Sequence, residues 1–312
     1  MTLAFVFPGQ GSQSVGMLSE LAAAHPAVRA AFDEASAGAG VDLWALALQG
    51  PEERLNQTEF TQPALLAGSV GVYRAWIAAG GARPALLSGH SLGEYSALVC
   101  AGALPLAAAA GLVRERGRLM QEAVPAGTGA MAAVLGGEDA QIAEACAAAA
   151  GDAVVAPANF NSPGQVVIAG HAAAVDRALA KLAEMGVRKA IKLPVSVPSH
   201  TALMRGAADR LAERMAALPW SMPAVPVVQN ADARAHDSLD AIRDALVRQL
   251  HLPVRWTECV QALQSAGATR LGECGPGKVL AGLARRIDKS LDARALGTPA
   301  DFDAALAAWP AG

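Results

Sequence analysis

The chain has 312 residues, of which 53% are hydrophobic and 17% are charged. This composition is typical of a globular protein with a large core, in one large domain or two smaller ones, and it excludes a disordered chain. The formal net charge is only −3, so we expect no nucleic-acid partner. A small net charge is still compatible with a local basic patch that binds an acidic protein.

Strands and helices alternate in the first part of the chain. "TLAFVFPGQGSQ" predicts a short buried strand that ends in a Gly-rich turn. A helical pattern follows over residues 19–80, with breaks expected at Pro26, at Gly50-Pro51 and at Pro63. "ARPALLSGH" then predicts a strand, and "SLGEYSALVCAG" predicts the helix after it. This repetition favours a parallel sheet with helices on both faces.

The order of predicted elements changes near Pro125. A strand in "GAMAAVLG" and a helix in "EDAQIAEACAAAA" are followed by two strands around the Asn-Ser-Pro-Gly turn of "AVVAPANFNSPGQVVIAG". A helix in "AAAVDRALAKLAEMG" and a strand in "VRKAIKLPVS" complete a β-α-β-β-α-β unit. We therefore expect a small domain at residues 126–197, inserted into a large domain formed by residues 1–125 and 198–312.

The last part of the chain returns to the first pattern. "SLDAIRDALVRQL" predicts a helix, and "ATRLGECGPGKVLAGLARRI" predicts a strand, a Gly-Pro-Gly turn and a helix. The fold class expected from all elements is α/β.

The cysteines and the apolar runs indicate the compartment. The chain has four scattered cysteines and no C-x-x-C pair: Cys100, Cys146, Cys259 and Cys274. No apolar run approaches the roughly 20 residues of a membrane span, and no signal-peptide pattern begins the chain. We expect a cytoplasmic protein with no membrane partner, no metal site and no disulfide framework.

Ser91 lies in Gly89-His90-Ser91-Leu92-Gly93, which matches G-x-S-x-G. In this motif a strand turns sharply into a helix, and the flanking glycines let the backbone crowd together while the serine points outward. The helix N-terminus would place N–H groups where an oxyanion forms. The alternative is a serine that caps the helix, with the glycines needed only for packing.

His200 is the histidine best placed to act as the base for this serine. It follows a predicted strand end and two prolines in "LPVSVPSHTALM", and it comes after the serine in chain order. The alternative is a histidine that caps the following helix. The carboxylates between the two residues, Asp139, Asp152 and Asp176, lie in helix or turn contexts that do not suit a triad. An amide or a backbone carbonyl could orient the base instead.

Several segments occur together in a characteristic order: "FPGQGSQ", "GHSLGEYSAL", "VRERG", "NFNSPGQVVIAG", "PSHTALM" and "ECGPGKVLAGL". Over nearly the whole chain they resemble bacterial malonyl-CoA:acyl carrier protein transacylases of type II fatty acid synthesis. The resemblance implies an α/β-hydrolase-like large domain with an inserted ferredoxin-like small domain and an active site between them. It also implies malonyl transfer from malonyl-CoA to the phosphopantetheine thiol of holo acyl carrier protein, by a ping-pong mechanism through a malonyl-serine. No cofactor is expected, because the coenzyme A thioester is itself the substrate, and we expect a monomer.

The resemblance also assigns catalytic roles. It implies that Ser91 carries the acyl group, that His200 is the general base, and that the backbone carbonyl of Gln249 holds the histidine. Because the implied contact uses the backbone, we expect the Gln249 side chain to matter much less than His200. The N–H groups of Gln10 and Leu92 would form the oxyanion hole.

Arg116, in "VRERG", would bind the free carboxylate of malonate. A planar guanidinium matches a carboxylate with two parallel hydrogen bonds, so it would select charged malonyl over neutral acetyl. The alternative is a surface arginine, like the flanking Arg114 and Arg118, which project from other faces of the helix.

Weaker pocket candidates are Asn161, Gln165 and Gln62. Asn161 and Gln165 could equally stabilise the Asn-Ser-Pro-Gly turn, and Gln62 could equally pack beside Pro63. Ser199 precedes the base. In the related acyltransferase domains of modular polyketide synthases, Phe at this position accompanies malonyl and Ser accompanies methylmalonyl. The surrounding "VPSH" resembles the free-standing malonyl enzymes, so we expect malonyl.

Three other functions compete with this reading: a serine hydrolase, a catalytically silent binding subunit, and a trans-acting acyltransferase that serves a polyketide synthase. An absent triad carboxylate and the arginine argue against the hydrolase, and the intact candidate residues argue against the silent subunit. An acidic carrier would need a local basic patch. The candidates are Arg188, Lys189 and Lys192 in one cluster, and Lys278, Arg285 and Arg286 in another.

Overall fold

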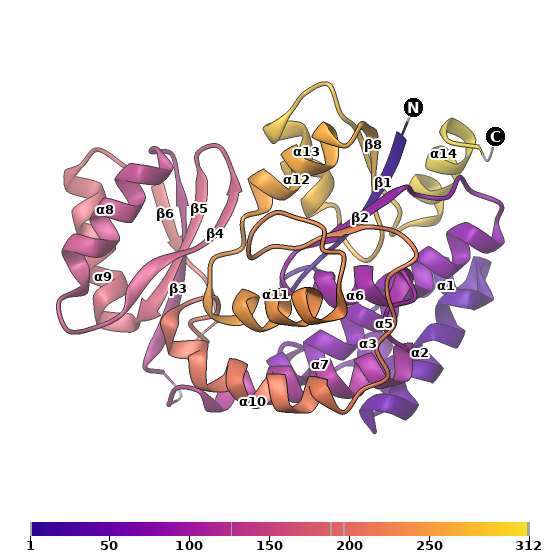
Figure 1. The fold of residues 1–312 in the computed structure, drawn as a ribbon, viewed down its shortest axis with the longest axis horizontal. Helices are drawn as coiled ribbons and strands as arrows, with labels where there is room; N and C mark the ends of the chain where they lie inside the picture. The colour runs from indigo at the N-terminus through magenta and orange to yellow at the C-terminus, as the bar shows by residue number, and fades with distance from the viewer. Residues whose placement is uncertain (1, 126, 188, 196, 311–312) are drawn as a thin grey trace.

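The structure is a computed structural model that describes residues 2–125, 127–187, 189–195 and 197–310. It is a mixed α/β fold with one five-stranded parallel sheet and a separate four-stranded antiparallel sheet (Figure 1). The α/β class expected from the sequence is confirmed.

The parallel sheet has the strand order β7-β2-β1-β8-β9. Its strands are β1 (Thr2–Phe7), β2 (Leu86–Gly89), β7 (Val227–Val228), β8 (Ala268–Glu273) and β9 (Asp292–Ala295). Successive side chains of β1 point to opposite faces, and both faces are buried: Phe5 and Phe7 pack in one apolar cluster, and Ala4 and Val6 pack in another. The central strand is therefore apolar and buried from Leu3 to Phe7, in keeping with the buried strand predicted from its sequence.

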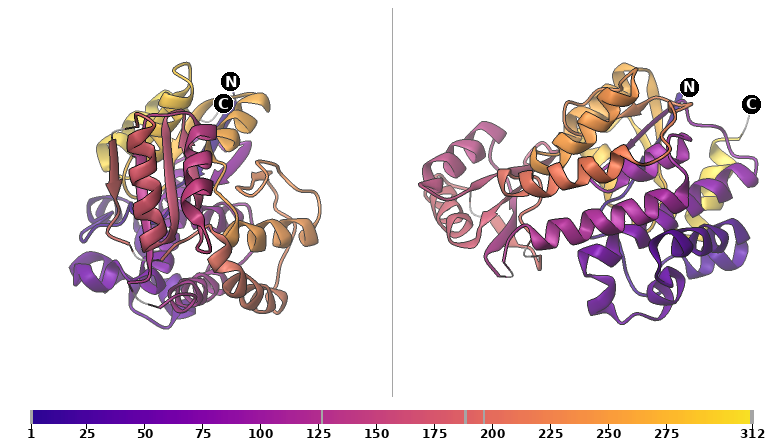
Figure 2. Two further views of the ribbon diagram at one scale, coloured as in Figure 1. Left: turned by 90° about the vertical axis from the view of Figure 1, so that its left-hand side faces the viewer. Right: turned by 60° about the horizontal axis from the view of Figure 1, so that its bottom comes forward.

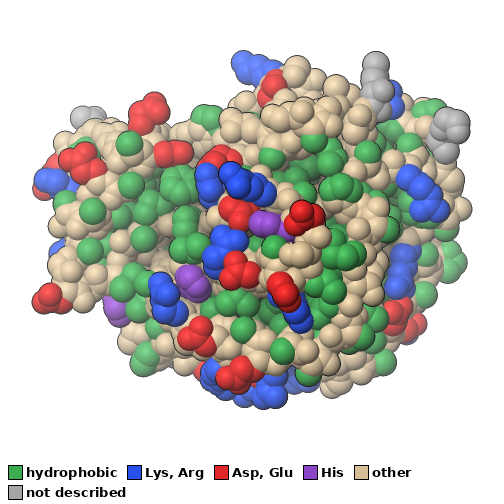
Figure 3. Space-filling view, in the orientation of Figure 1, with side chains coloured by type: hydrophobic (Ala, Val, Ile, Leu, Met, Phe, Trp, Pro, Cys, Tyr) green, Lys and Arg blue, Asp and Glu red, His purple; other side chains and the backbone are tan. Residues whose placement is uncertain are grey.

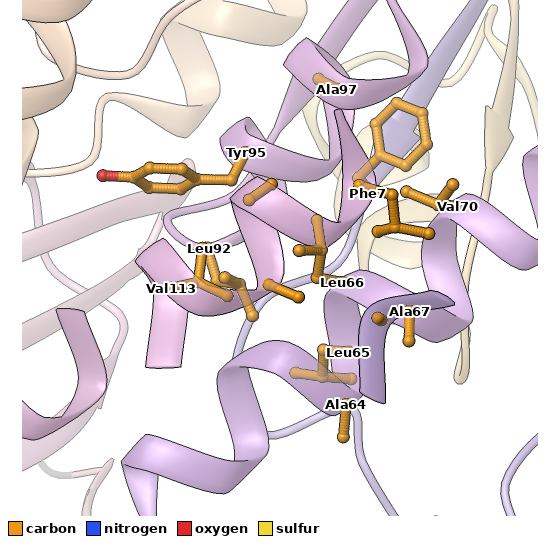
Figure 4. Packing of buried hydrophobic residues seen from close by; sticks show 14 of the residues in the cluster. Phe7, Ala64, Leu65, Leu66, Ala67, Val70, Leu92, Tyr95, Ala97 and Val113 are labelled. Atoms are coloured by element: carbon orange, nitrogen blue, oxygen red, sulfur yellow. The ribbon is translucent and has the colours of Figure 1, made fainter. Parts of the chain in front are cut away.

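Helices cover both faces of the parallel sheet. The cluster around Phe7 includes residues of α2 (Pro26–Ala39), α5 (Thr58–Ala78), α6 (Gly93–Cys100) and α7 (Leu106–Glu122). Figure 4 shows part of it, where Leu92 at the start of α6 lies near Leu66 of α5 and Val113 of α7. The cluster on the opposite face includes residues of α12 (Trp256–Ser265) and α13 (Val279–Ile287). This packing holds the β2–α6 junction from both sides.

The helical region over residues 19–80 ends and restarts at two of the three expected breaks. Pro26 begins α2, and Gly50-Pro51 separates α3 (Leu43–Gln49) from α4 (Glu52–Leu55). The break expected at Pro63 is wrong, because this proline lies inside α5. Pro63 is buried with its neighbours, so packing outweighs the hydrogen bond that a proline cannot donate. The remaining helices are α1 (Ser19–Ala24), a 3₁₀ turn (Ala202–Met204), α10 (Arg205–Ala216), α11 (Leu239–His251) and α14 (Pro299–Ala308).

The antiparallel sheet has the order β4-β5-β3-β6, and its elements follow the predicted β-α-β-β-α-β sequence. They are β3 (Gly129–Leu135), α8 (Asp139–Ala150), β4 (Val155–Ser162), β5 (Gln165–His171), α9 (Ala172–Glu184) and β6 (Lys189–Lys192). Helices α8 and α9 lie side by side on one face of this sheet (Figure 2, left). Met131, Val167 and neighbouring residues form a smaller apolar cluster on the other face.

A short backbone contact joins β4 to the segment before α12. Phe160 N–H donates to Val254 O at 2.9 Å, and Val254 N–H donates to Ala158 O at 2.8 Å. The antiparallel sheet is thereby fixed beside the carboxyl end of the parallel sheet. The domain limits at residues 126 and 197 stay a prediction, and residue 126 lies outside the described residues.

Charged side chains of both signs are interspersed on the face shown in Figure 3, in keeping with the small net charge. Within the described ranges, no helix has the length and apolar character that crossing a bilayer requires.

Candidate active site

A cavity of about 560 Å³ lies between the carboxyl ends of β1 and β2 and the apolar face of the antiparallel sheet. Met131, Val167 and Leu193 line it on the sheet side. It brings together most residues singled out in the sequence: Gln10, Gln62, Ser91, Leu92, Arg116, Asn161, Gln165, Ser199 and His200. Gln249 is buried behind this lining, where it touches several of these residues.

Ser91 occupies a sharp turn between β2 and α6 and has a positive φ of 51°. The two glycines of its motif are required by close approach. A Cβ on Gly89 would lie 1.9 Å from the carbonyl carbon of Gly93, and a Cβ on Gly93 would lie 2.0 Å from Phe7 O. The glycines thus let the strand, the turn and the helix meet, and the serine projects into the cavity.

His200 contacts both Ser91 and Gln249. Ser91 Oγ lies 2.7 Å from His200 Nε2, and His200 Nδ1 lies 2.7 Å from the backbone oxygen of Gln249. A carbonyl oxygen only accepts, so Nδ1 must carry the proton and Nε2 must present its lone pair to the serine hydroxyl. The ring is therefore held in the tautomer that a general base for Ser91 needs.

Burial keeps His200 neutral. Its side chain is 3% exposed. Burial first, and then the charge of Arg116 and the proximity of His90, lower the pKa of His200 to about 3, against the opposing hydrogen bond to Gln249. At neutral pH the ring is unprotonated and able to accept the serine proton.

Arg116 is 1% exposed and lies on α7. Its Nη1 donates to Gln62 Oε1 at 2.8 Å, and its Nη2 donates to Gln249 Oε1 at 3.0 Å and to Ser91 Oγ at 3.2 Å. Its guanidinium carbon lies 5.5 Å from the centre of the Tyr95 ring. In the described parts of the chain no carboxylate forms an ion pair with it, so a buried cation faces the cavity beside the serine.

The neighbouring arginines on α7 point elsewhere. Arg114 donates to Ala39 O at 2.7 Å, and Arg118 pairs with Glu115 and Glu122 on the surface. Only Arg116 of these three lines the cavity. The surface-arginine alternative therefore does not describe Arg116.

Leu92 and Gln10 both line the cavity. Among the hydrogen bonds of the described residues, none uses the backbone N–H of either residue. Leu92 is the N-cap of α6, where the helix dipole favours a negative charge. Two unused N–H groups at this place could accept an oxyanion.

Asn161, one of the weaker pocket candidates, contacts a histidine: its Oδ1 lies 2.8 Å from Nε2 of His90. Gln165 accepts from Arg286 Nη1 at 2.7 Å and so joins the β4–β5 turn to α13. The Ser199 hydroxyl makes a long 3.4 Å contact with Val197 O. None of these contacts involves Ser91 directly.

Three buried residues that support the serine turn were not predicted from the sequence: Asn230, Glu94 and Gln229. Asn230 Oδ1 accepts from the backbone N–H of Ser91, and Asn230 Nδ2 donates to Gly89 O, both at 2.8 Å. Glu94 is fully buried and accepts hydrogen bonds from Asn230 and Gln229. A charged residue within the apolar stretch "LGEYSALV" was the available signal for Glu94, because an unpaired carboxylate is almost never fully buried.

The Gln249 side chain also does more than the sequence indicated. Its Nε2 donates to Ser91 O at 2.8 Å and to Glu94 Oε2 at 3.0 Å, while its Oε1 accepts from Arg116. Both the backbone oxygen and the side chain of this residue therefore contact the site.

Among the described residues, no group of three His, Cys, Asp or Glu side chains lies together as a metal site would require.

The chain matches one protein family, and the relatives described here carry the same name. Residues 4–275 match the family described as "Acyl transferase domain". The chain is 58% identical to the malonyl CoA-acyl carrier protein transacylase of Escherichia coli K12, over 97% of this chain and 98% of that protein. It is 41% identical to the Bacillus subtilis protein of the same name, over 97% of this chain and 96% of that one.

Solved structures agree with these matches. The crystal structure of a malonyl-CoA:acyl carrier protein transacylase from Xanthomonas oryzae has a TM-score of 0.98 and 69% identity, covering 99% of this chain and 100% of that one. A malonyl-transacylase in complex with a type II polyketide synthase acyl carrier protein has a TM-score of 0.97 and 52% identity, with 99% and 100% covered.

Proposed function

The chain belongs to the acyl transferase domain family, and we propose that it transfers malonyl from malonyl-CoA to the phosphopantetheine thiol of holo acyl carrier protein, supplying fatty acid synthesis. Its similarity to malonyl CoA-acyl carrier protein transacylases supports the substrate and the partner. The hydrogen-bonded series from Ser91 through His200 to the Gln249 carbonyl, with Arg116 beside the serine, is the observation that carries the proposal.

The first half-reaction acylates the enzyme. Ser91 Oγ attacks the malonyl carbonyl carbon while its proton passes to His200 Nε2. The N–H groups of Gln10 and Leu92 stabilise the oxyanion as it forms. The oxyanion then collapses, the C–S bond breaks, and the imidazolium protonates the departing coenzyme A thiolate. Malonyl-serine and free coenzyme A result.

The second half-reaction reverses these steps on a different thiol. The phosphopantetheine thiol gives its proton to His200 and attacks the malonyl-serine ester. A new C–S bond forms, the Ser91 Oγ–carbon bond breaks, and the histidine returns the proton to the serine. Because the two thiols react in turn with one enzyme, the kinetics are ping-pong.

Arg116 selects the acyl group. The malonate carboxylate lies one methylene beyond the carbonyl carbon that Ser91 attacks, and the Arg116 guanidinium already contacts the Ser91 hydroxyl. A carboxylate placed there receives charge-assisted hydrogen bonds in a site from which water is largely excluded. An acetyl group gains nothing from the cation.

The proposal also covers the fold description, the cellular location, the oligomeric state and the absence of a cofactor. We describe the large part of the fold as α/β-hydrolase-like and the antiparallel part as an inserted ferredoxin-like domain. A cytoplasmic location is supported by the cysteines, which are unpaired in the structure. We propose a monomer without a cofactor, which sedimentation and the protein's absorption spectrum would test.

Transfer itself is tested with malonyl-CoA and a holo acyl carrier protein, by following malonyl on the carrier by mass. The wild-type enzyme should load the carrier, and the matching apo carrier, which lacks the thiol, should stay unloaded. Malonate released to water at the same rate with and without carrier would instead identify a hydrolase.

A second candidate is the supply of malonyl to a polyketide synthase. It is favoured by one observation, the 52% identity to a malonyl-transacylase solved with a polyketide carrier. Comparing kcat/KM for a fatty acid carrier and a polyketide carrier distinguishes the two, and a preference for the polyketide carrier would overturn the fatty acid assignment.

A further inference from the structure

Glu94 is a fully buried carboxylate directly behind the serine turn, and neither half-reaction uses it. Its Oε1 accepts from Gln229 Nε2 at 2.8 Å. Its Oε2 accepts from the backbone N–H of Asn230 at 2.8 Å and from Gln249 Nε2 at 3.0 Å. Burial raises the pKa of Glu94 to about 7, and the three donors together with the charge of Arg116 act against this shift and favour the ionised carboxylate.

Two residues bound to Glu94 also hold the backbone of Ser91. Asn230 Oδ1 accepts from the Ser91 N–H, and Gln249 Nε2 donates to the Ser91 oxygen, both at 2.8 Å. Ser91 has a φ of 51°, a conformation that residues other than glycine rarely adopt and that needs support from its surroundings. Glu94 therefore holds the backbone of Asn230 and the side-chain amide of Gln249, the two residues that support this turn.

The carboxylate, together with the carbonyl oxygen of Ser91, decides which way the Gln249 amide points. A primary amide has one donating side and one accepting side. Glu94 can only accept, so it takes the NH₂ end, and the amide oxygen is left to accept from Arg116 Nη2 at 3.0 Å. The reversed amide would set an NH₂ group against the guanidinium, with no acceptor between them.

Glu94 is also linked electrostatically to Arg116. Burial lowers the pKa of Arg116, and the nearby Tyr95 and the charge of Glu94 act in the opposite direction. The Gln249 side-chain amide separates the Glu94 carboxylate from the Arg116 guanidinium. The carboxylate therefore compensates the buried cation without occupying the guanidinium donors that face the cavity. A directly paired carboxylate would compete with the substrate for those donors.

We propose that Glu94 is a positioning residue which, through Gln249, orients the Arg116 guanidinium toward a substrate carboxylate and, through Asn230, fixes the Ser91 turn. This inference rests on the proposed function, because it assigns the reason for malonyl selectivity to a residue that touches no substrate. The orientation of Arg116 affects only malonyl, whereas the support of the Ser91 turn by Asn230 and Gln249 affects every acyl group equally. The malonyl-to-acetyl ratio of kcat/KM therefore isolates the path through Gln249.

Glu94→Gln keeps the size of the side chain and removes its charge. The new amide can keep its oxygen on Gln249 and Asn230 only by setting its NH₂ group against Gln229 Nε2, and in either orientation the negative charge near Arg116 is lost. We expect kcat/KM for malonyl-CoA to fall about tenfold or more, and the malonyl-to-acetyl ratio to fall with it. Glu273→Gln is the matched control, because Glu273 is a buried carboxylate that accepts from Ala281 N–H at 2.8 Å at the start of α13. It should lower thermal stability and leave the ratio unchanged.

A double variant tests whether Glu94 acts through Gln249. Adding Glu94→Gln to Gln249→Ala should lower the ratio no further than Gln249→Ala alone. The proposal is contradicted if the ratio in Glu94→Gln equals that of the wild type while both activities fall together, or if the two losses of ratio multiply. If Glu94→Gln does not fold, Glu94→Asp, whose carboxylate is one methylene shorter, is judged by the same two criteria. A wild-type enzyme that transfers no malonyl at all would contradict the proposed function instead.

Discussion

Arg116 Nη2 lies 3.2 Å from Ser91 Oγ, so the cation and the candidate nucleophile are in direct contact across the cavity. A substrate carboxylate that binds the guanidinium is thereby brought within one methylene of the attacked carbon. This geometry suits a 1,3-dicarbonyl acid such as malonate.

Arg116→Ala should lower malonyl transfer by roughly 10²–10³-fold, because losing one partner of a buried charge pair costs about 3–5 kcal/mol and about 1.4 kcal/mol is tenfold. Transfer or hydrolysis of acetyl-CoA should stay level or rise. Arg116→Lys should recover malonyl transfer only in part, since an ammonium cannot form the two parallel bonds. The measurement is kcat/KM for both thioesters. Equal losses for malonyl and acetyl would mean that Arg116 supports the fold or coenzyme A binding.

His200→Ala should abolish most acyl transfer, because Ser91 loses its base in both half-reactions. Gln249→Ala should be less damaging, since the backbone carbonyl that orients the histidine remains. It should nevertheless reduce the malonyl-to-acetyl ratio, because its side chain contacts Arg116. Steady-state kinetics of the two variants with both thioesters provide the comparison. If Gln249→Ala is as inactive as His200→Ala, the side chain rather than the carbonyl controls the base.

The pH profile should reflect the low pKa of His200, about 3. We expect kcat/KM for acetyl-CoA to stay flat from about pH 5 to pH 8, where an ordinary histidine would lose half its base form near pH 6.5. Arg116→Ala removes a positive neighbour, so the acidic limb should move to higher pH in that variant. An acidic limb with its midpoint near pH 6.5 in the wild type would contradict this account of His200.

Stability has a related pH dependence. The folded chain resists protonation of His200 between about pH 6.5 and pH 3, while the unfolded chain accepts the proton there. The unfolded state therefore binds more protons in this window, and the His200 contribution to the free energy of unfolding falls as the pH falls. Denaturant unfolding at pH 7 and pH 5 should reveal the loss, and His200→Gln should reduce it. The same pH dependence in that variant would assign the loss to other groups.

Carrier binding should depend on the basic residues of β6. Lys189 and Lys192 are exposed on this edge strand, and Lys192 lies 2.5 Å from Asp176; Arg188 lies outside the described residues. Reversing both lysines to Glu should raise the KM for an acidic holo carrier at low salt, while acylation by malonyl-CoA stays nearly unchanged. Lys181→Glu, on α9, is the matched control. An unchanged carrier KM would direct attention to Lys278, Arg285 and Arg286.

The sequence was informative where a residue type is forced by local geometry. Gly89 is required by its close approach to the nearby Gly93, so the motif located the serine turn without a structure, although Gly93 is itself required by Phe7 of the neighbouring strand. The support of that turn could not be predicted, because Glu94 and Asn230 are 136 positions apart and meet only through the strand order of the sheet. Pro63 was misread for a similar reason, since distant packing keeps it within a helix.

The central claim is that Ser91 carries the malonyl group, and intact mass after a brief incubation with malonyl-CoA tests it most directly. The account predicts one malonyl adduct on the wild-type enzyme, removed on addition of holo carrier protein, and none on Ser91→Ala. Arg116→Ala should form the adduct slowly, and Glu273→Gln should form it normally. An adduct on Ser91→Ala at the wild-type level, or direct loading of the carrier with no acylated enzyme at any time, would contradict the account.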